Sequence, residues 1–254
     1  MPTQMPNPFY LDWTFWSTLV ALIAIVLSQL PPIHLLLRPK RIEVEVNSRI
    51  HITHKVGNPN VGLHVSIKNG GGRELRIRSI GLHISRDGKQ LMSMPAQNYF
   101  EKINDPTSTL FVPFSLKPNE YWSHVVNFLN FFERSTDKLY RESETALKNH
   151  IYESLKEVGE ENKKPVKADE ALVKPFTKLF ERLFIWEPSE YIVELTVVTD
   201  PKSAMYAKKY RFTIYESDTE ELKKYVNDYP YGAGIYYNNE THTGIAAPLS
   251  EHLG

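Results

Sequence analysis

The stretch ELRIRSIGLHISRDGKQLMSM, residues 74–94, decides the fold class because its pattern is that of a β-hairpin. Apolar and polar residues alternate, as in a strand with one buried face, and Asp87-Gly88 is a strong signal for a two-residue turn. The alternation changes phase between Ile77 and Ile80. One extra residue near Ser79 therefore predicts a β-bulge, which lets a long strand bend from one sheet toward another.

Similar alternation lies on both sides of this hairpin. We expect strands at residues 42–46, 49–56, 63–68, 109–115 and 120–128, two more between 190 and 215, and a polar loop at 95–108. Short strands at this spacing, separated by Gly- and Pro-containing turns, are typical of a two-sheet, immunoglobulin-like β-sandwich. The pattern resembles those modules in general and identifies no single family.

The periodicity changes to 3.6 at residues 137–157, which predicts an amphipathic helix. A second helix is expected to begin near Pro175, because proline suits a first helical turn. Both would form a helical insertion at about 133–187 in one mainly β domain at 41–216. Two separate domains are the alternative, which we disfavour because the two strands after the insertion would be only marginally stable alone.

Residues 217–254 are expected to form a short helix and a Tyr/Gly-rich tail. Ser217 and Glu220 have the spacing of a capping box, which predicts the start of the helix. The tail segment YPYGAGIYY has no helical or strand period. It is either a strap across the sandwich or a segment offered to a partner protein. Its tyrosines are the candidate partner-binding residues Tyr229, Tyr231, Tyr236 and Tyr237.

The N-terminal segment predicts a membrane anchor. Residues 13–30 carry no charge and would cover about 27 Å as a helix. Pro31-Pro32 is expected to kink this helix, which would extend over residues 13–37. A cleaved signal peptide is the alternative, but no Lys or Arg precedes the apolar run. The candidate anchor residues are Trp13, Trp16, Leu19, Leu22, Ile25 and Leu30.

Flanking charge predicts the orientation of this anchor. Residues 1–12 contain no Lys or Arg, whereas Arg38, Lys40 and Arg41 follow the apolar segment. The positive-inside rule then makes residues 1–12 a short extracytoplasmic tail and places the main domain in the cytoplasm. The absence of cysteine is compatible with a reducing compartment. An exported, envelope-facing binding domain is the alternative.

Two groups of side chains are candidate binding surfaces. The first is a basic patch for an anion or a partner, made of Lys68, Arg73, Arg76 and Arg78. Its alternative interpretation is a solvated strand face. The second is a set of phenylalanines near the helical insertion, which either dock a partner or belong to the core. These are Phe128, Phe131, Phe132, Phe176, Phe180 and Phe184.

The sequence contains no nucleotide, metal or catalytic motif. The nine histidines show no metal-ligand spacing; His51 and His54, for example, would lie on opposite faces of a strand. We therefore expect no cofactor and no bound metal. Thirty basic residues balance 30 acidic ones, and no aromatic side chain is interleaved with the arginines, so we expect no nucleic-acid partner.

These features together predict a membrane-anchored, non-enzymatic interaction or sensor module, within a bacterial membrane-associated complex. Its expected partners are the lipid bilayer and a protein of unidentified type, with a homo-oligomer formed through the anchor as a further option. An enzyme with a dispersed, fold-specific site is the alternative. It would require a His–carboxylate pair or paired carboxylates in a cleft.

Overall fold

The computed structural model describes residues 10, 13–29, 38–102, 107–158, 165–238 and 244–252. The structure is mainly β, with 42% strand, and contains a nearly closed antiparallel sheet together with helices. The fold class expected from the alternating segments is therefore confirmed at the level of a mainly β fold with helices.

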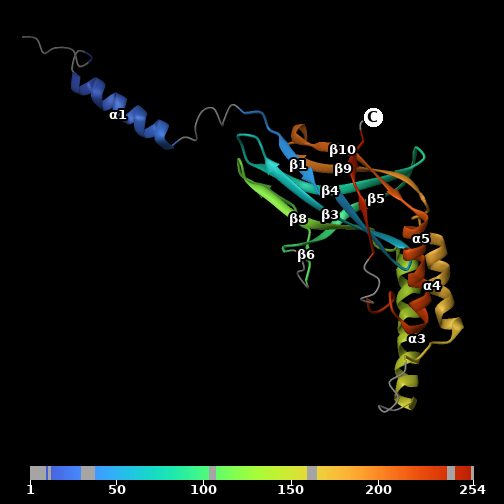
Figure 1. The fold of residues 1–254 in the computed structure, drawn as a ribbon. Helices are drawn as coiled ribbons and strands as arrows, with labels where there is room; N and C mark the ends of the chain where they lie inside the picture. The colour runs from blue at the N-terminus through green and yellow to red at the C-terminus, as the bar shows by residue number, and fades with distance from the viewer. Residues whose placement is uncertain are drawn as a thin grey trace, which may run out of the picture.

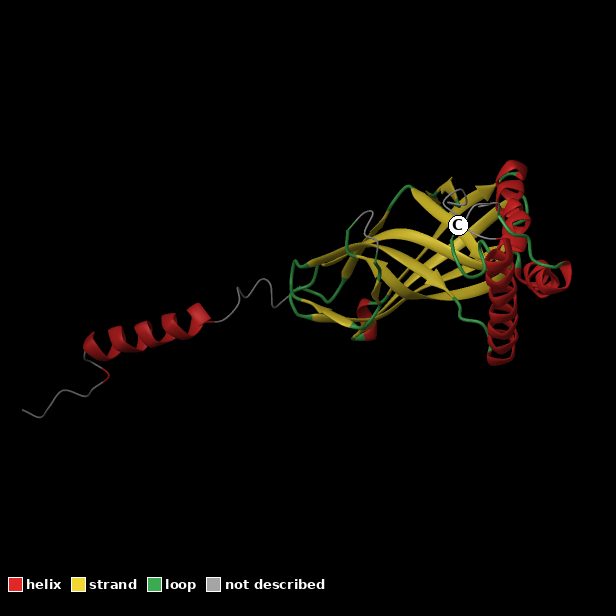
Figure 2. Cartoon of the chain, turned by 90° about the horizontal axis from the view of Figure 1, so that it is seen from below, coloured by secondary structure: helices red, strands yellow, loops and turns green. Residues whose placement is uncertain are grey.

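The strands are β1 (Ile42–Val46), β2 (Arg49–Lys55), β3 (Asn58–Asn69), β4 (Leu75–Arg86), β5 (Lys89–Phe100), β6 (Thr109–Leu110), β7 (Phe114–Leu116), β8 (Tyr121–Leu129), β9 (Ser189–Asp200), β10 (Tyr206–Ile214), β11 (Ile245–Pro248) and β12 (Ser250–Glu251). The helices are α1 (Trp13–Gln29), α3 (Arg134–Val158), α4 (Glu170–Leu183) and α5 (Glu216–Lys223), with the 3-10 helices η2 (Lys202–Ala204) and η3 (Lys224–Tyr231). Helices α3, α4 and α5 gather at one end of the sheet (Figures 1 and 2).

The described strands form a 12-stranded sheet whose two ends are brought together by the C-terminal segment. The order is β11-β2-β3-β8-β5-β4-β9-β10-β12. Outside this order, β1 pairs with β3, β6 with β5 and β7 with β4. β11 pairs with β2 at one end of this order, and β12 pairs with β10 at the other. Because Leu249 alone separates β11 from β12, the chain joins the two edges directly.

The bulge predicted near Ser79 is confirmed. The register between β4 and β9 shifts between Ile77 and Ser79, and Arg78 and Ser79 are both exposed. This extra residue keeps the apolar side chains on both sides of the bulge turned inward. The buried side chains of β4 are Leu75, Ile77, Ile80, Leu82 and Ile84.

Strand β5 passes from one group of strands to another. It pairs with β4 as far as Pro95, and from Ala96 onward it pairs with β8. The polar loop predicted at 95–108 is therefore wrong in its first part. Pro95 is tolerated because it lies where β5 exchanges one partner strand for the other, and a missing N–H there interrupts no continuous ladder. The strand predicted at 109–115 is divided between β6 and β7.

Two apolar cores hold the fold together. The larger one is formed by the inward faces of the strands. The second joins α3, α4 and η3 to Val56, which lies in the turn between β2 and β3. Tyr229 of the C-terminal tail is fully buried in this second core, and the Ala168 N–H donates to the Pro230 carbonyl at 2.8 Å. The helical insertion and the tail therefore pack as one layer.

The helix predicted at residues 137–157 is confirmed by α3, whereas α4 begins earlier than expected. Asp169 is its N-cap, and Pro175 is its sixth residue rather than part of its first turn. Four side chains bury one face of α4, and this tertiary packing outweighs the hydrogen bond that proline cannot donate. They are Val173, Phe176, Leu179 and Phe180.

Helix α5 also begins at a different residue from the predicted one. Its N-cap is Tyr215 rather than Ser217, and the Tyr215 N–H donates to Asp218 Oδ2 at 2.9 Å. The predicted capping box was therefore placed two residues too late, although it identified the correct helix. A carboxylate in the first turn serves the same purpose as in a capping box, because it accepts a backbone donor of the helix start.

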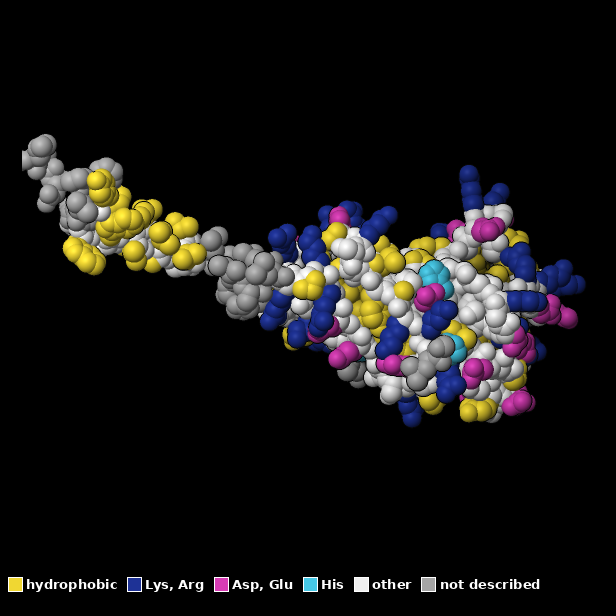
Figure 3. Space-filling view, turned by 90° about the horizontal axis from the view of Figure 1, so that it is seen from above, with side chains coloured by type: hydrophobic (Ala, Val, Ile, Leu, Met, Phe, Trp, Pro, Cys, Tyr) yellow, Lys and Arg dark blue, Asp and Glu magenta, His cyan; other side chains and the backbone are white. Residues whose placement is uncertain are grey.

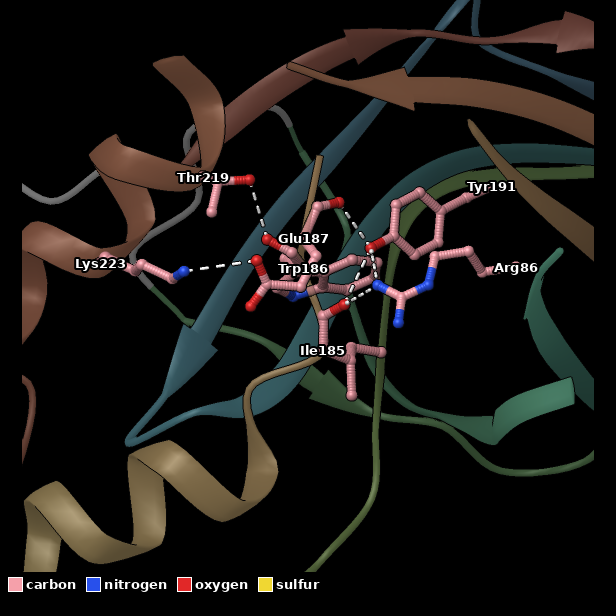
Figure 4. A network of polar contacts seen from close by, with 7 residues as sticks. All are labelled: Arg86, Ile185, Trp186, Glu187, Tyr191, Thr219 and Lys223. Atoms are coloured by element: carbon pink, nitrogen blue, oxygen red, sulfur yellow. Dashed lines mark hydrogen bonds and ion pairs between the residues drawn. The ribbon is translucent and has the colours of Figure 1, made fainter. Parts of the chain in front are cut away.

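The segment at residues 185–187, which connects α4 to β9, is held from two sides (Figure 4). From the sheet, the Tyr191 hydroxyl lies 2.8 Å from the carbonyl oxygens of both Ile185 and Glu187. From α5, Thr219 Oγ1 donates to the Trp186 carbonyl at 3.0 Å. The Trp186 side chain between these bonds is fully buried. This connection therefore fixes the helical layer to the sheet.

The predicted membrane-spanning helix at residues 13–37 is wrong. Within the described residues, no helix has both the length and the apolarity that a bilayer crossing requires. The predicted single-pass orientation with a cytoplasmic main domain is overturned by the same finding.

The predicted anchor residues are only partly covered by this structure. Trp13, Trp16, Leu22 and Ile25 are exposed on α1, and Leu19 is half-buried. Leu30 and the predicted kink at Pro31-Pro32 lie outside the described residues.

Candidate functional site

A groove with a volume of about 370 Å³ lies where the sheet meets the helical layer. Its walls are the turn between β2 and β3, the segment after β8 and the first turns of α3. We call it the α3 groove. It is lined by Lys55, residues 58–60, residues 129–132, Asp137, Tyr140, Arg141 and Glu144.

Hydrogen bonds fix the walls of the α3 groove. Asn58 Nδ2 donates to the Asn130 carbonyl at 2.8 Å, which ties the β2–β3 turn to the segment after β8. Asn130 Nδ2 in turn donates to the Ser93 carbonyl on β5 at 2.7 Å. The groove is therefore formed before any ligand arrives, which reduces the ordering cost of binding.

Two adjacent phenylalanines at this wall point in different directions. Phe132 packs against Tyr140, with ring centroids 5.2 Å apart, and belongs to the border of the second core. Phe131 is 76% exposed. A single exposed aromatic side chain needs no explanation, but Phe131 lies on the rim of a groove that also carries charged groups.

Both signs of charge line the groove. Asp137 and Arg141 pair with each other on α3, at 2.8 Å. Neither Lys55 nor Glu144 forms an ion pair with another described residue. Lys55 Nζ lies 5.2 Å from the centroid of the Tyr140 ring, so the ammonium group makes a cation–π contact on that side. The groove thus offers a cation and a carboxylate to a ligand.

Two polar groups at the groove, Asn60 Oδ1 and the Tyr140 hydroxyl, differ in whether they have a hydrogen-bond partner. Asn60 Oδ1 is buried and has no hydrogen-bond donor among the described residues. The Tyr140 hydroxyl, in contrast, donates to the Ile235 carbonyl at 2.7 Å. Burial, and secondarily the nearby Glu144 carboxylate, raises the pKa of Tyr140. Tyr140 is therefore a neutral structural donor, whereas Asn60 Oδ1 is a buried acceptor without a donor among the described residues.

The structure places the residues of the predicted basic patch on different elements. Arg73, Arg76 and Arg78 are all exposed, and Arg78 pairs with Asp200 at 2.5 Å. Lys68 lies on β3, which pairs with β1 and β8 rather than with the arginine strand β4. Lys68 instead lines a separate hollow together with Arg38 and Arg41.

The predicted tyrosine tail has one buried and one exposed end. Tyr229 is fully buried in the second core, and Tyr231 and Tyr236 are half-buried. Tyr237 is exposed. Most of this segment therefore lies against the helical layer, whereas the strap considered from the sequence lay across the sandwich.

The sequence identified only part of the α3 groove. Phe131 and Phe132 were among the phenylalanines proposed for docking, whereas Phe128, Phe176 and Phe180 are buried core residues. Lys55, Asn60 and Glu144 were not singled out. Their only sequence signal is a polar side chain beside a turn or on a solvated helix face, which many residues share.

No histidine is among the described residues that line this groove, and its carboxylates are Asp137 and Glu144. In the part of the chain that the structure describes, no three His, Cys, Asp or Glu side chains are placed to hold a metal ion together. His54 is buried, with Nε2 2.9 Å from the Leu222 carbonyl oxygen and Nδ1 accepting the Gly57 N–H at 3.1 Å. His54 therefore serves the junction between the sheet and the helices.

Comparison with known proteins adds no relative from which a function can be transferred. No protein-family model matches the chain, and no curated protein sequence matches it.

Proposed function

We propose that this chain is a non-enzymatic interaction module whose α3 groove binds a peptide segment of a partner protein. The observation that carries the proposal is the exposed Phe131 ring on the same preformed groove as Lys55 and Glu144, two charges without ion-pair partners among the described residues. Aromatic anchors in a fixed groove contribute strongly to protein–protein binding.

The chemistry of the groove favours a peptide. An apolar or aromatic side chain can lie against Phe131, while a basic side chain pairs with Glu144 and an acidic group with Lys55. A peptide supplies all of these groups on one short molecule.

The finer fold assignment, an immunoglobulin-like β-sandwich, is part of this proposal. It is supported by the division of the strands into two groups, with β2, β3 and β8 in one and β4, β9 and β10 in the other, connected through β5. Such a scaffold presents loops and inserted helices for recognition.

A random-peptide display library selected on the full chain tests the proposed function. The enriched peptides are expected to contain an aromatic or large apolar residue near a basic one, with affinities measured by fluorescence anisotropy. Phe131→Ala and Glu144→Gln should each weaken binding by roughly tenfold or more. Leu110→Ala removes an exposed apolar side chain outside the groove and should leave the affinity unchanged. Peptides that bind the Phe131→Ala variant as tightly as the wild type would show the proposal to be wrong.

A further inference from the structure

A second hollow lies at the opposite end of β3 from the α3 groove. Asn60, near the start of β3, belongs to the α3 groove, whereas Lys68, near its end, lines the second hollow. Eight residues of extended strand separate the two positions by about 26 Å. We call the second site the basic hollow; its volume is about 370 Å³, and its lining includes Arg38, Arg41, Glu43, Lys68, Gly70 and Asn119.

Buried Asn69 fixes the loops that form the basic hollow. Its side-chain amide donates to the Arg73 and Leu116 carbonyls at 2.8 and 2.9 Å. Its side-chain oxygen accepts the Gly71 N–H at 2.9 Å. Its backbone carbonyl accepts the Asn119 N–H at 2.9 Å. The glycine tract (residues 70–72) and the turn between β7 and β8 are therefore held in place by one fully buried residue, Asn69.

Because Gly70 has no side chain, the charged groups of Glu43 and Arg41 can lie close to its backbone. A Cβ built on Gly70 would lie 2.8 Å from Glu43 Oε1 and 3.3 Å from Arg41 Nε. The Gly70 N–H also donates to the Arg41 carbonyl at 3.1 Å, which ties the start of β1 to the glycine tract. Arg41 is thereby held at the wall of the hollow.

The described lining of the basic hollow has a surplus of positive charge. Arg38, Arg41 and Lys68 face one carboxylate, Glu43, so the surplus is two charges in a chain whose total formal charge is zero. Glu43 pairs with Arg41 at 2.5 Å. That hydrogen bond, with Lys68 contributing, also lowers the pKa of Glu43, so the carboxylate stays ionised. Figure 3 shows Lys and Arg side chains gathered on the end of the domain next to the N-terminal segment.

We propose that the basic hollow is a binding site for a phosphoryl group, carried either by a soluble phosphate ester or by an anionic lipid headgroup. A doubly charged phosphate matches the two surplus charges of the lining. Guanidinium groups suit phosphate oxygens because they donate two N–H bonds in one plane, and Lys68 adds a point charge. The site is independent of the peptide-binding function proposed for the α3 groove.

Calorimetric titration of the full chain with inorganic phosphate and with phenyl phosphate tests this proposal. We expect saturable binding that Lys68→Gln weakens by roughly tenfold or more, since a charge-assisted hydrogen bond is lost. Lys89→Gln, a matched change at an exposed residue of the β4–β5 hairpin, should leave binding unchanged. Both variants should keep the wild-type circular dichroism spectrum, because both side chains are exposed.

A second experiment, with lipid vesicles, identifies whether a lipid or a soluble compound carries the phosphoryl group. Sedimentation compares binding to vesicles that contain phosphatidic acid with binding to neutral vesicles. If a lipid headgroup occupies the site, wild type should bind the phosphatidic acid vesicles more strongly than Lys68→Gln does. If Lys68→Gln weakens binding only to the soluble phosphates, the ligand is a soluble phosphate ester. Absence of saturable binding to all of these ligands would overturn the proposal. Equal binding by wild type and Lys68→Gln would overturn it as well.

Discussion

Gly57 lies directly against the backbone of Phe180. A Cβ built on Gly57 would be 2.7 Å from the Phe180 carbonyl oxygen and 2.8 Å from its Cα. This approach joins the turn between β2 and β3 to α4, and so positions the helical layer on the sheet. Gly57 also has a φ of +81°, which favours glycine on conformational grounds.

Gly57→Ala is expected to destabilise the protein by about 2–4 kcal/mol. The positive φ contributes about 1 kcal/mol of this loss, and the rest comes from a collision with backbone atoms that cannot rotate away. Urea unfolding followed by circular dichroism measures the change. Because the α3 groove lies at the same junction, peptide affinity should fall as well.

Gly88→Ala is the matched control for this substitution. Gly88 has a similar φ of +73°, but a Cβ built there meets no atom within 4 Å. Its expected cost is therefore about 1 kcal/mol, from conformation alone. Equal losses for the two variants would show that the contact between Gly57 and Phe180 does not contribute.

The β part of the fold was predictable because its signals are local. Period-two alternation identified the long strands, the phase change identified the bulge after Ile77, and Asp87-Gly88 identified the hairpin. Pairing between distant segments was not predictable in the same way. β5 continues through Pro95 because β8 becomes its partner strand there, and no pattern within residues 89–100 predicts this pairing.

The candidate sites were less predictable than the fold, for the same physical reason. Lys68 was predicted to lie on the strand neighbouring that of Arg76 and Arg78, but β3 and β4 do not pair in the sheet. Lys68 instead lies opposite Glu43 in the pairing of β1 with β3, and lines the same hollow as Arg41. Hydropathy alone also predicted a bilayer-spanning helix at the N-terminus, whereas no helix among the described residues has the length and apolarity that a crossing requires.

Thr219→Val should destabilise the protein by about 1–3 kcal/mol. Valine keeps the shape of threonine but removes the hydroxyl that donates to the buried Trp186 carbonyl, and a buried acceptor left without that donor is costly. Thr145→Val is the control, because Thr145 makes a similar bond to the Arg141 carbonyl at an exposed position of α3. Its change should stay within about 0.5 kcal/mol. A Thr219→Val variant as stable as wild type would contradict the role assigned to this connection.

Tyr229→Phe and Tyr140→Phe are expected to change stability in opposite directions. The Tyr229 hydroxyl is buried without a hydrogen-bond partner among the described residues, so its removal should stabilise the protein by up to about 1–2 kcal/mol. The Tyr140 hydroxyl donates to the Ile235 carbonyl, and its removal should cost about 1 kcal/mol. Thermal unfolding at neutral pH compares the two variants. Destabilisation of both by the same amount would indicate that the Tyr229 hydroxyl has a partner in solution.

Buried tyrosines are expected to make the protein sensitive to alkali. Burial is the main cause that raises the pKa of Tyr140, Tyr210 and Tyr229 above the ordinary tyrosine value of about 10. Below about pH 10 these groups are protonated in both states, so their stabilising contribution is complete. At higher pH the unfolded chain releases protons that the folded chain retains. The free energy of unfolding then falls by up to about 1.4 kcal/mol per pH unit for each such tyrosine.

Urea unfolding between pH 9 and pH 11.5 measures this loss. Tyr229→Phe removes one of the three groups and should give a shallower decline than the wild type above pH 10. Thr219→Val removes no titratable group, so it should lower the free energy of unfolding at every pH without changing the slope. A wild-type stability that stays constant up to pH 11.5 would mean that these hydroxyls ionise as readily in the folded chain as in the unfolded one. The buried positions of Tyr140 and Tyr229 in the second core would then be incorrect.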